Sequence, residues 1–389
     1  MPLRFLTAGE SHGPALVAIL EGIPAGLELP AEIIDAELAR RQQGYGAGPR
    51  MKLEHDQVRI LSGVMEGLTT GGPLALQIEN LDHAKWKGRP VAPFTTPRPG
   101  HVDLAGLVKY GYSDIRPALE RASARETAAR VAVGAICRHF LAQFEIKLGG
   151  YVLSIGTVAA NLDEILYLER IRLAETSDVR CPDEHAAEAM RQAIHQVMLD
   201  RDTLGGVLEV VALGLPVGLG SHVHWDRRLE GRLGAAVLSI PAIKGVEIGP
   251  AFENTRRPGT QIHDPIRLED GRLVRPTDRS GGTEGGITSG QPLVIRAAMK
   301  PIATTLTPQQ SVDLADGQET STSYERSDFC PVPRAVPIIE AMVAFVLADA
   351  LLEKVGGDSL AEIMPRFAAL RQARLFDLNI AKDDHLFWP

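Results

Sequence analysis

The sequence has few of the features that mark secreted, membrane-spanning or nucleic-acid-binding proteins. Only three of its 389 residues are cysteine, Cys137, Cys181 and Cys330, and none belongs to a C-x-x-C pair. A disulfide framework and a zinc knuckle are therefore disfavoured, and a reducing compartment is favoured. Asp and Glu outnumber Lys and Arg by 49 to 41, and this net charge of -8 argues against a nucleic-acid partner.

A long uninterrupted hydrophobic run is also missing. The first ten residues contain no apolar stretch of the kind found in secretory signals. The most apolar segment, residues 336–352, carries Glu340 and Asp349 and is too short to cross a bilayer. We therefore expect a cytoplasmic protein with no membrane partner.

What remains is the composition of a globular protein, with 44% hydrophobic and 23% charged residues. Apolar residues at three- and four-residue spacing predict helices over 31–42, 119–145, 184–200, 227–239, 334–353 and 358–372. Short β-branched runs bounded by Gly and Pro predict strands over 16–20, 57–62, 73–79, 151–157, 207–213 and 291–297. Residues 253–291 form the longest predicted irregular stretch.

Two short segments recur in the same order. Residues 22–27 (G-I-P-A-G-L) are similar to 214–219 (G-L-P-V-G-L), and 67–76 are similar to 286–295. We therefore predict an α+β fold spanning 1–389 as one domain, with two similar halves of about 1–150 and 151–389 packed as one body. Chance recurrence of turn residues is the alternative.

The first motif with chemical potential is G-E-S-H-G at residues 9–13. Its glycines permit a tight turn that presents Ser11 and His12 side by side. The same residues match G-x-S-x-G, the nucleophile elbow of serine hydrolases. That elbow needs a preceding core strand and a following helix, and only a few residues precede this one.

A second group combines R-P-G-H at 98–101 with E-R-A-S-A-R-E-T at 120–127. Arg121 and Arg125 are four residues apart and would share one helix face, with Ser123 nearby. Guanidinium groups, a hydroxyl and helix amides suit a phosphate or a carboxylate. A solvated helix with internal Glu–Arg pairs is the simpler alternative.

A third motif, R-S-D-F-C at 326–330, offers Asp328 as a proton acceptor and Arg326 as an anion ligand, although an Asp before a helix is often only a cap. Lys300 follows a glycine-rich stretch and could hold a phosphate. Walker A and G-x-G-x-x-G patterns are absent, which argues against nucleoside triphosphate and Rossmann sites. His222 and His224 lack a third ligand, so we expect no metal site.

Together these motifs resemble the chorismate synthase family from Arg4 to about Leu352. The resemblance implies a β-α-β sandwich, a homotetramer, and conversion of 5-enolpyruvylshikimate 3-phosphate into chorismate and phosphate. It also implies reduced FMN as the cofactor, NADPH as an indirect reductant and an external flavin reductase as a partner.

The resemblance also assigns roles to individual residues. The catalytic group would be Ser11, His12, His101, Ser123 and Asp328. The substrate would be bound by Arg41, Arg50, Arg98, Arg125 and Arg326. The flavin would be held by Arg121, Ala122, Ser123, Pro241, Ala242, Gly285, Lys300, Pro301, Ile302, Ala303, Thr304 and Arg326.

Two positions depart from the family pattern. Ala47 stands where the family usually has the arginine of G-Y-G-R-G, and Pro241 stands where an asparagine often precedes Ala242. The missing arginine motivates one alternative, a non-catalytic anion- or flavin-binding relative. A serine hydrolase that uses Ser11 is the other.

Overall fold

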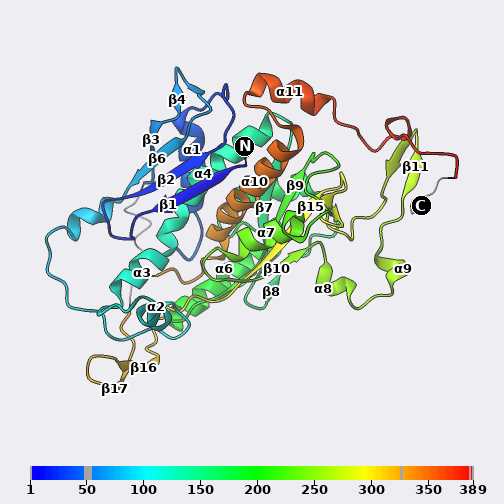
Figure 1. The fold of residues 1–389 in the computed structure, drawn as a ribbon. Helices are drawn as coiled ribbons and strands as arrows, with labels where there is room; N and C mark the ends of the chain where they lie inside the picture. Colours follow the sequence, from blue (N-terminus) through cyan, green and yellow to red (C-terminus); the bar gives the residue numbers. More distant parts are fainter. Residues whose placement is uncertain (1, 48–54, 325–326, 385–386, 388–389) are drawn as a thin grey trace.

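The computed structural model describes residues 2–47, 55–324, 327–384 and 387. Arg50 and Arg326, both predicted site residues, lie outside these ranges. Two antiparallel sheets enclose a layer of helices (Figure 1). The first sheet has the order β1 (Arg4–Ala8), β2 (Ala15–Glu21), β6 (Leu74–Glu79) and β3 (Val58–Ser62). The second has the order β10 (Ile243–Ile248), β15 (Leu293–Met299), β9 (Gly206–Leu213), β7 (Lys147–Ile155) and β8 (Val158–Ala159).

The first sheet buries one face, as the alternation of its side chains requires. Leu74, Leu76 and Ile78 of β6 are buried, whereas the residues between them are partly accessible. The buried face packs on α1 (Ala31–Gln42) and α4 (Thr127–Ala142), while α7 (Leu229–Leu238) and α10 (Val332–Val355) pack on the second sheet. This arrangement confirms the predicted β-α-β sandwich.

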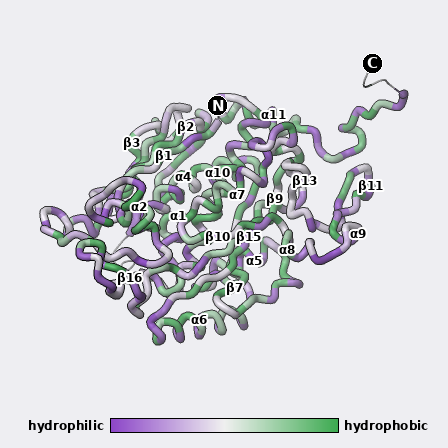
Figure 2. Tube along the Cα trace, turned by 60° about the horizontal axis from the view of Figure 1, so that its bottom comes forward, coloured by the Kyte–Doolittle hydropathy of each residue, from purple (hydrophilic) through white to green (hydrophobic). Residues whose placement is uncertain are grey.

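The helical layer is tightest where α4 crosses α10. A β-carbon added to Gly134 would lie 2.2 Å from Cβ of Ala341, so only glycine permits this approach. Both helices are largely green, and hence apolar, in the middle of the molecule in Figure 2. Among the described residues, α10 alone is long and apolar enough to cross a membrane, but 89% of its apolar window is buried between the two sheets. It is therefore placed as a core helix.

The remaining elements are short or peripheral. The further helices are α2 (Asp103–Tyr110), α3 (Arg116–Ala122), α5 (Tyr167–Thr176), α6 (Glu184–Leu199), α8 (Ala251–Asn254), α9 (Gly259–Ile262) and α11 (Leu360–Ala368), with 3-10 turns η2 (Leu81–Lys85), η3 (Ala124–Glu126), η4 (Trp225–Arg227) and η5 (Leu375–Asp377). Four hairpins complete the fold: β4 (Val64–Met65) with β5 (Leu68–Thr69), β11 (Arg267–Glu269) with β12 (Arg272–Val274), β13 (Thr283–Glu284) with β14 (Ile287–Thr288), and β16 (Gln310–Asp313) with β17 (Gln318–Ser321).

The predicted single helix over 119–145 was wrong. The chain leaves helical geometry at Ser123, whose backbone has φ -61 and ψ 141, and η3 and α4 follow. The reason is local, because the Ser123 hydroxyl accepts a hydrogen bond from the Arg125 amide and so caps the next turn. Strands β1 and β10 and helices α2 and α5 were not predicted.

The two recurrent segments occupy equivalent places in the two sheets. Thr69 Oγ1 donates to Pro24 O at 2.6 Å and accepts from Leu27 N at 2.9 Å. Thr288 Oγ1 donates to Pro216 O at 2.6 Å and accepts from Leu219 N at 2.8 Å. The strand order β1-β2-β6-β3 also matches β7-β9-β15-β10, element by element along the chain. We propose on these grounds that the fold consists of two similar halves packed as one body.

Candidate active site

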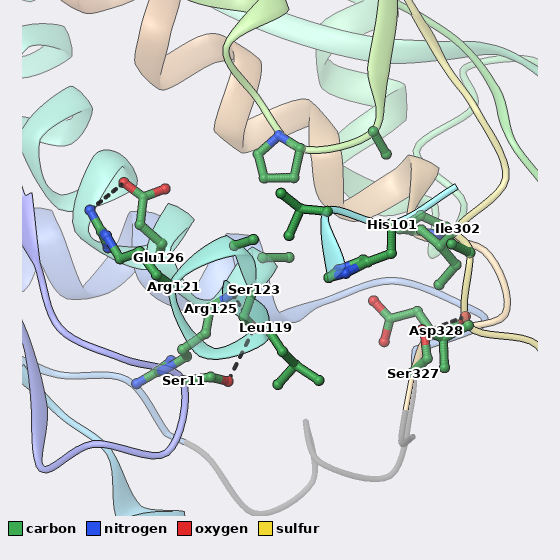
Figure 3. A pocket seen from close by; sticks show the side chains of 18 of the residues that line it. Ser11, His101, Leu119, Arg121, Ser123, Arg125, Glu126, Ile302, Ser327 and Asp328 are labelled. Carbon is green, nitrogen blue, oxygen red and sulfur yellow. Dashed lines mark hydrogen bonds and ion pairs between the residues drawn. The ribbon is translucent and has the colours of Figure 1, made fainter. Parts of the chain in front are cut away.

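A cavity of ≈ 990 Å³ lies where several segments distant in sequence meet. The β1–β2 turn, η2, the loop before α2, the α3–η3 junction, the loop before β10, the residues after β15 and the start of α10 all contribute to its wall. Figure 3 shows Ser11, Arg121, Ser123 and Arg125 on one side and His101, Ile302 and Asp328 on the other. Its volume is at the upper end of the range of about 300–1,000 Å³ for small-molecule sites.

Most of the predicted site residues line this one cavity. They are Ser11, His12, Arg41, Arg98, His101, Arg121, Ala122, Ser123, Arg125, Pro241, Ala242, Lys300, Ile302, Ala303, Thr304 and Asp328. Pro301 is not part of the wall, and Gly285 lies apart, in the turn between β13 and β14. Their assigned roles stay predictions.

The cavity wall is strongly basic although the whole chain is acidic. Seven arginines and two lysines among the described lining residues face three carboxylates, those of Asp82, Glu126 and Asp328. Lys85, Arg89, Arg130 and Arg334 belong to this set and were not among the predicted site residues. A compound with several negative charges is the ligand that such a wall favours.

His12 is held by a carboxylate that the sequence analysis did not single out. Its Nδ1 lies 2.6 Å from Oε1 of Glu120, and its backbone amide donates to Oε2 of Glu120 at 2.7 Å. Burial opposes ionisation of the Glu120 carboxyl, but the hydrogen bonds from His12 outweigh this effect and keep its pKa below the usual value. The ring also packs against Trp86, with centroids 4.4 Å apart. Glu120 and Trp86 therefore fix the orientation of the His12 ring.

The helix break at Ser123 brings two hydroxyl groups together. Ser123 Oγ donates to Ser11 Oγ at 3.1 Å, and both residues line the cavity. Had the helix continued through residue 123, this side chain would follow the helix face and lose its capping position. The break in the helix at Ser123, which the sequence analysis did not predict, therefore forms part of the site.

His101 and Arg98 share a second hidden carboxylate. Asp103, at the start of α2, is fully buried and accepts from Arg98 Nε at 2.8 Å and Arg98 Nη2 at 3.0 Å. Its Oδ1 also contacts His101 Nδ1 at 2.5 Å, and Gly100 allows the turn between them with φ +73. Burial raises the pKa of Asp103, but His101 and Arg98 overcome this and hold the pKa far below its usual value.

Two predicted substrate arginines converge on a third carboxylate. Arg125 Nη1 donates to both Asp56 oxygens, at 2.6 and 2.7 Å, and Arg125 Nε donates to Asn80 Oδ1 at 2.8 Å. Arg41 Nη1 lies 3.6 Å from Asp56, and its Nε donates to Thr127. All three charged side chains are buried. Asp56 thus anchors both guanidinium groups at the cavity wall.

The predicted flavin segment is fastened by its backbone. Lys300 N donates to Ala242 O at 3.0 Å, and Lys300 Nζ donates to Gly100 O at 2.7 Å. Ala242 has φ +67, a left-handed conformation that is unfavourable for alanine and that tends to occur at functional sites. The Ala242 carbonyl is therefore engaged with the protein backbone at Lys300.

A family model described as chorismate synthase matches residues 3–352. The chain belongs to the chorismate synthase family. It is 53% identical to the chorismate synthase of Trichlorobacter lovleyi over 378 residues, covering 93% of this chain and 96% of that protein. Identity to the chorismate synthase of Aquifex aeolicus is also 53%, with 94% and 96% covered. A crystal structure of chorismate synthase superposes with a TM-score of 0.78 at 46% identity, covering 95% of this chain and 97% of that chain.

Family membership argues against the hydrolase alternative, and so does the geometry. Ser11 lies in the turn between two antiparallel strands, β1 and β2, rather than between a strand and a helix. Its hydroxyl pairs with Ser123, while the neighbouring His12 is bonded to Glu120. The nucleophile elbow of serine hydrolases is therefore not formed here.

The residues that the sequence analysis missed are of two kinds: Glu120 and Asp103 lie behind the cavity wall, whereas Lys85, Trp86, Arg89, Arg130 and Arg334 form part of it. Glu120 lies inside the E-R-A-S-A-R-E-T motif, and Asp103 follows His101 by two residues, so proximity in sequence was an available signal for both. Trp86, Lys85 and Arg89 carry no recognisable motif. Within the described ranges no group of three His, Cys, Asp or Glu residues could hold a metal ion.

Proposed function

We propose that this chain converts 5-enolpyruvylshikimate 3-phosphate into chorismate and phosphate by a 1,4-elimination. The observation that carries the proposal is the convergence of Ser11, His12, His101 and Asp328 from three separate segments on one basic cavity, in a chain of this family. The elimination removes a ring hydrogen as a proton and releases phosphate, and it leaves a second double bond in the ring. It involves no net oxidation or reduction.

The substrate's charges match the wall. It carries two carboxylates and a phosphate, and guanidinium groups bind such anions through paired, charge-assisted hydrogen bonds. Arg98 is the best-supported ligand among the described residues, because Asp103 holds it rigidly beside Thr304. Arg41 and Arg125 contribute charge from positions fixed by Asp56. Arg50 and Arg326 are further proposed ligands outside the described residues.

The proton transfers are assigned to groups on opposite sides of the cavity. His12, oriented by Glu120, would protonate or stabilise the departing phosphate, with Ser11 and Ser123 positioning it. Asp328, near the opposite wall, would help to remove the ring hydrogen as a proton. His101 would adjust the protonation of the cofactor beside it. The two proton-handling residues thus stay apart, as an elimination from two ring carbons requires.

The cavity also fits the cofactor that the family needs. Leu119, Ile302, Ala303 and Val102 supply apolar wall for a planar ring system, and basic side chains lie close to them. Arg121, Ser123, Ala242 and the 300–304 segment would hold FMN, whereas Gly285 lies apart from this cavity. When bound, reduced FMN supplies electron density that helps phosphate to depart. We further propose an external flavin reductase fed by NADPH, a homotetramer and a cytoplasmic location, each supported by family membership.

An anaerobic assay tests the proposal. The chain is mixed with 5-enolpyruvylshikimate 3-phosphate and chemically reduced FMN, and chorismate absorbance and phosphate release are followed together. We expect equal amounts of both products, and none with oxidised FMN. His12→Ala and Asp328→Ala should abolish turnover while flavin affinity is kept, whereas the surface variant His224→Ala should behave like the parent. Folded, flavin-bound parent protein that forms no chorismate contradicts the proposal.

A further inference from the structure

Arg334 lines the cavity but has no role in the reaction as described so far. Its Nη1 forms an ion pair with Oδ2 of Asp328, and its Nε donates to the backbone carbonyl of Arg41 at 3.1 Å. The side chain is 11% exposed. Its Nη2 makes no hydrogen bond to any described residue. The Arg334 guanidinium group thus joins Asp328, the proposed proton acceptor, to the end of α1. Its Nη2 remains available to donate a hydrogen bond to a ligand.

Helix stability does not explain a cation at this position. Arg334 is the third residue of α10, a 24-residue helix with no acidic residue in its first turn. The positive end of the helix dipole disfavours cations there, typically by about 0.3–1 kcal/mol. A compensating role outside the helix is therefore expected.

The loop that departs from the family pattern lies directly against Arg334. Gly44 has φ +145, and a β-carbon added to it would lie 3.0 Å from Cγ of Arg334. Two residues further on, Gly46 O accepts from Phe329 N at 3.0 Å, which ties the loop to the Asp328 segment. Ala47 follows at once. The cation of Arg334 is therefore next to the place where this chain lacks the arginine of its family.

We propose that Arg334 is a specificity and positioning residue that replaces the cation missing at Ala47. Nη1 holds the Asp328 carboxylate toward the cavity, and Nη2 is available to donate to an anionic oxygen of the substrate. Because the guanidinium plane carries both donors, the substrate anion and the proton acceptor are held in one fixed relation. This inference rests on the proposed function, since it assigns a ligand for that substrate.

The charges in the cavity wall support both parts of this proposal, the contact of Arg334 with Asp328 and its contact with the substrate. Asp328 is one of only three carboxylates among the described lining residues, and next to a multiply charged anion it would repel the substrate. An adjacent arginine offsets that repulsion without removing the carboxylate. The wall can therefore hold a proton acceptor and an anion side by side.

The test uses substrate binding as well as turnover. Arg334→Gln shortens the side chain and removes the charge but leaves an amide that can still donate a hydrogen bond. It should weaken binding of 5-enolpyruvylshikimate 3-phosphate to the complex with oxidised FMN, measured by calorimetry, by about 10- to 100-fold. KM should rise similarly, kcat should fall because Asp328 loses its support, and FMN affinity should stay the same. Arg172→Gln, which removes a surface arginine, is the matched control and should change nothing.

Rescue separates this role from a structural one. Adding Ala47→Arg to Arg334→Gln should recover most of the lost substrate affinity, since the second site restores the cation. Arg334→Lys keeps the positive charge and should retain more substrate affinity than Arg334→Gln. If Arg334→Gln does not fold, the affinity of Arg334→Lys is compared with that of the double variant Arg334→Lys/Ala47→Arg instead. Unchanged binding and turnover in Arg334→Gln overturn the inference, as does a loss that neither change reverses. Lack of chorismate formation by the parent chain would instead count against the proposed function.

Discussion

His12 Nδ1 and Glu120 Oε1 lie 2.6 Å apart, and the second oxygen of Glu120 accepts from the backbone amide of the same histidine. One carboxylate therefore fixes both the ring and the chain of His12. Since the two residues are 108 positions apart in sequence, the pair also joins the β1–β2 turn to α3. The proposed acid of the reaction is thus oriented by a group outside the substrate's reach.

Replacing Glu120 by Gln should therefore reduce turnover more than binding. The glutamine amide keeps the shape of the carboxylate but loses its charge. It therefore favours a different tautomer of the His12 imidazole. We expect kcat to fall by about 10- to 100-fold, a part of the usual contribution of acid–base catalysis, while KM changes little. Steady-state kinetics with reduced FMN in excess measure both. Glu21→Gln, which removes a surface carboxylate, should have parental kinetics, and parental kcat in Glu120→Gln would show that the pair has no role in catalysis.

Asp103→Asn should affect binding and turnover together, because Asp103 holds Arg98 and His101 at once. Breaking a buried ion pair from one side typically costs about 3–5 kcal/mol, so a lower free energy of unfolding is also expected. The surface pair His224–Asp226 has the same two-residue spacing, with Nδ1 and Oδ1 2.7 Å apart, and Asp226→Asn is the matched control.

Asp103→Asn should also change how the stability of the protein depends on pH. The pKa of Asp103 is lowered in the folded protein, so its contribution to stability is present above the ordinary value of about 4 and is lost as pH falls below it. Urea unfolding from pH 7 to pH 3 should show a smaller acid-induced loss for Asp103→Asn than for the parent. Equal losses would contradict this role of Asp103.

The sequence predicted the chemistry of the site better than its local geometry. Ser11, His101 and Asp328 belong to motifs whose residue types are themselves informative, and all three line the cavity. The helices and strands with clear apolar periodicity, such as α1 and β6, were also predicted near their observed bounds. That periodicity predicted individual elements of an α+β fold, whereas the β-α-β sandwich was expected from the resemblance to the family.

The supporting groups were missed because their positions in the sequence do not show which side chains they contact: Glu120 pairs with His12, 108 residues away, and Asp103 bonds Arg98 and His101 only once the loop before α2 is folded. No local pattern distinguishes the buried Asp103 from a helix cap, or Glu120 from one half of a surface ion pair. The break at Ser123 was missed since the Ala, Arg and Glu around it all favour a helix. Arg334 follows the R-S-D-F-C motif without belonging to it, so the sequence did not mark it as a site residue. Its ion pair with Asp328 is seen only in the folded structure.

Ionisation of the buried Asp278 carboxyl should lower the stability of the protein as pH rises. Burial raises the pKa of this carboxyl to about 6, and its Oδ2 has no hydrogen-bond partner among the residues that the structure describes. Between about pH 4 and 6 the folded state keeps a proton that the unfolded chain releases, so the free energy of unfolding falls across this window. Asp278→Asn keeps the bond to Gly282 N and should gain about 1–2 kcal/mol at pH 8, after allowance for partial exposure, and nothing at pH 4.

Its neighbour Asp264 provides a control of opposite sign. Burial opposes its ionisation, but Thr277 Oγ1 and the amides of Arg279 and Ser280 donate to it and lower its pKa. Asp264→Asn should therefore destabilise the protein at pH 8. Urea unfolding at both pH values compares the two variants, and destabilisation by Asp278→Asn at pH 8 would rule out this account.

Thr69 and Thr288 test the proposed equivalence of the two halves. Each hydroxyl joins a proline carbonyl to a leucine amide in a buried turn, so Thr→Val leaves both backbone groups without this partner. An unsatisfied buried group costs about 1–3 kcal/mol, and we expect each variant to lose about 2–4 kcal/mol in urea unfolding. Because the turns belong to different sheets, the double variant should lose the sum of the two. The exposed Thr70→Val should cost less than about 0.5 kcal/mol. A large loss at one threonine and none at the other would show that the matching bonds do not carry matching energies, and the equivalence would then hold for topology alone.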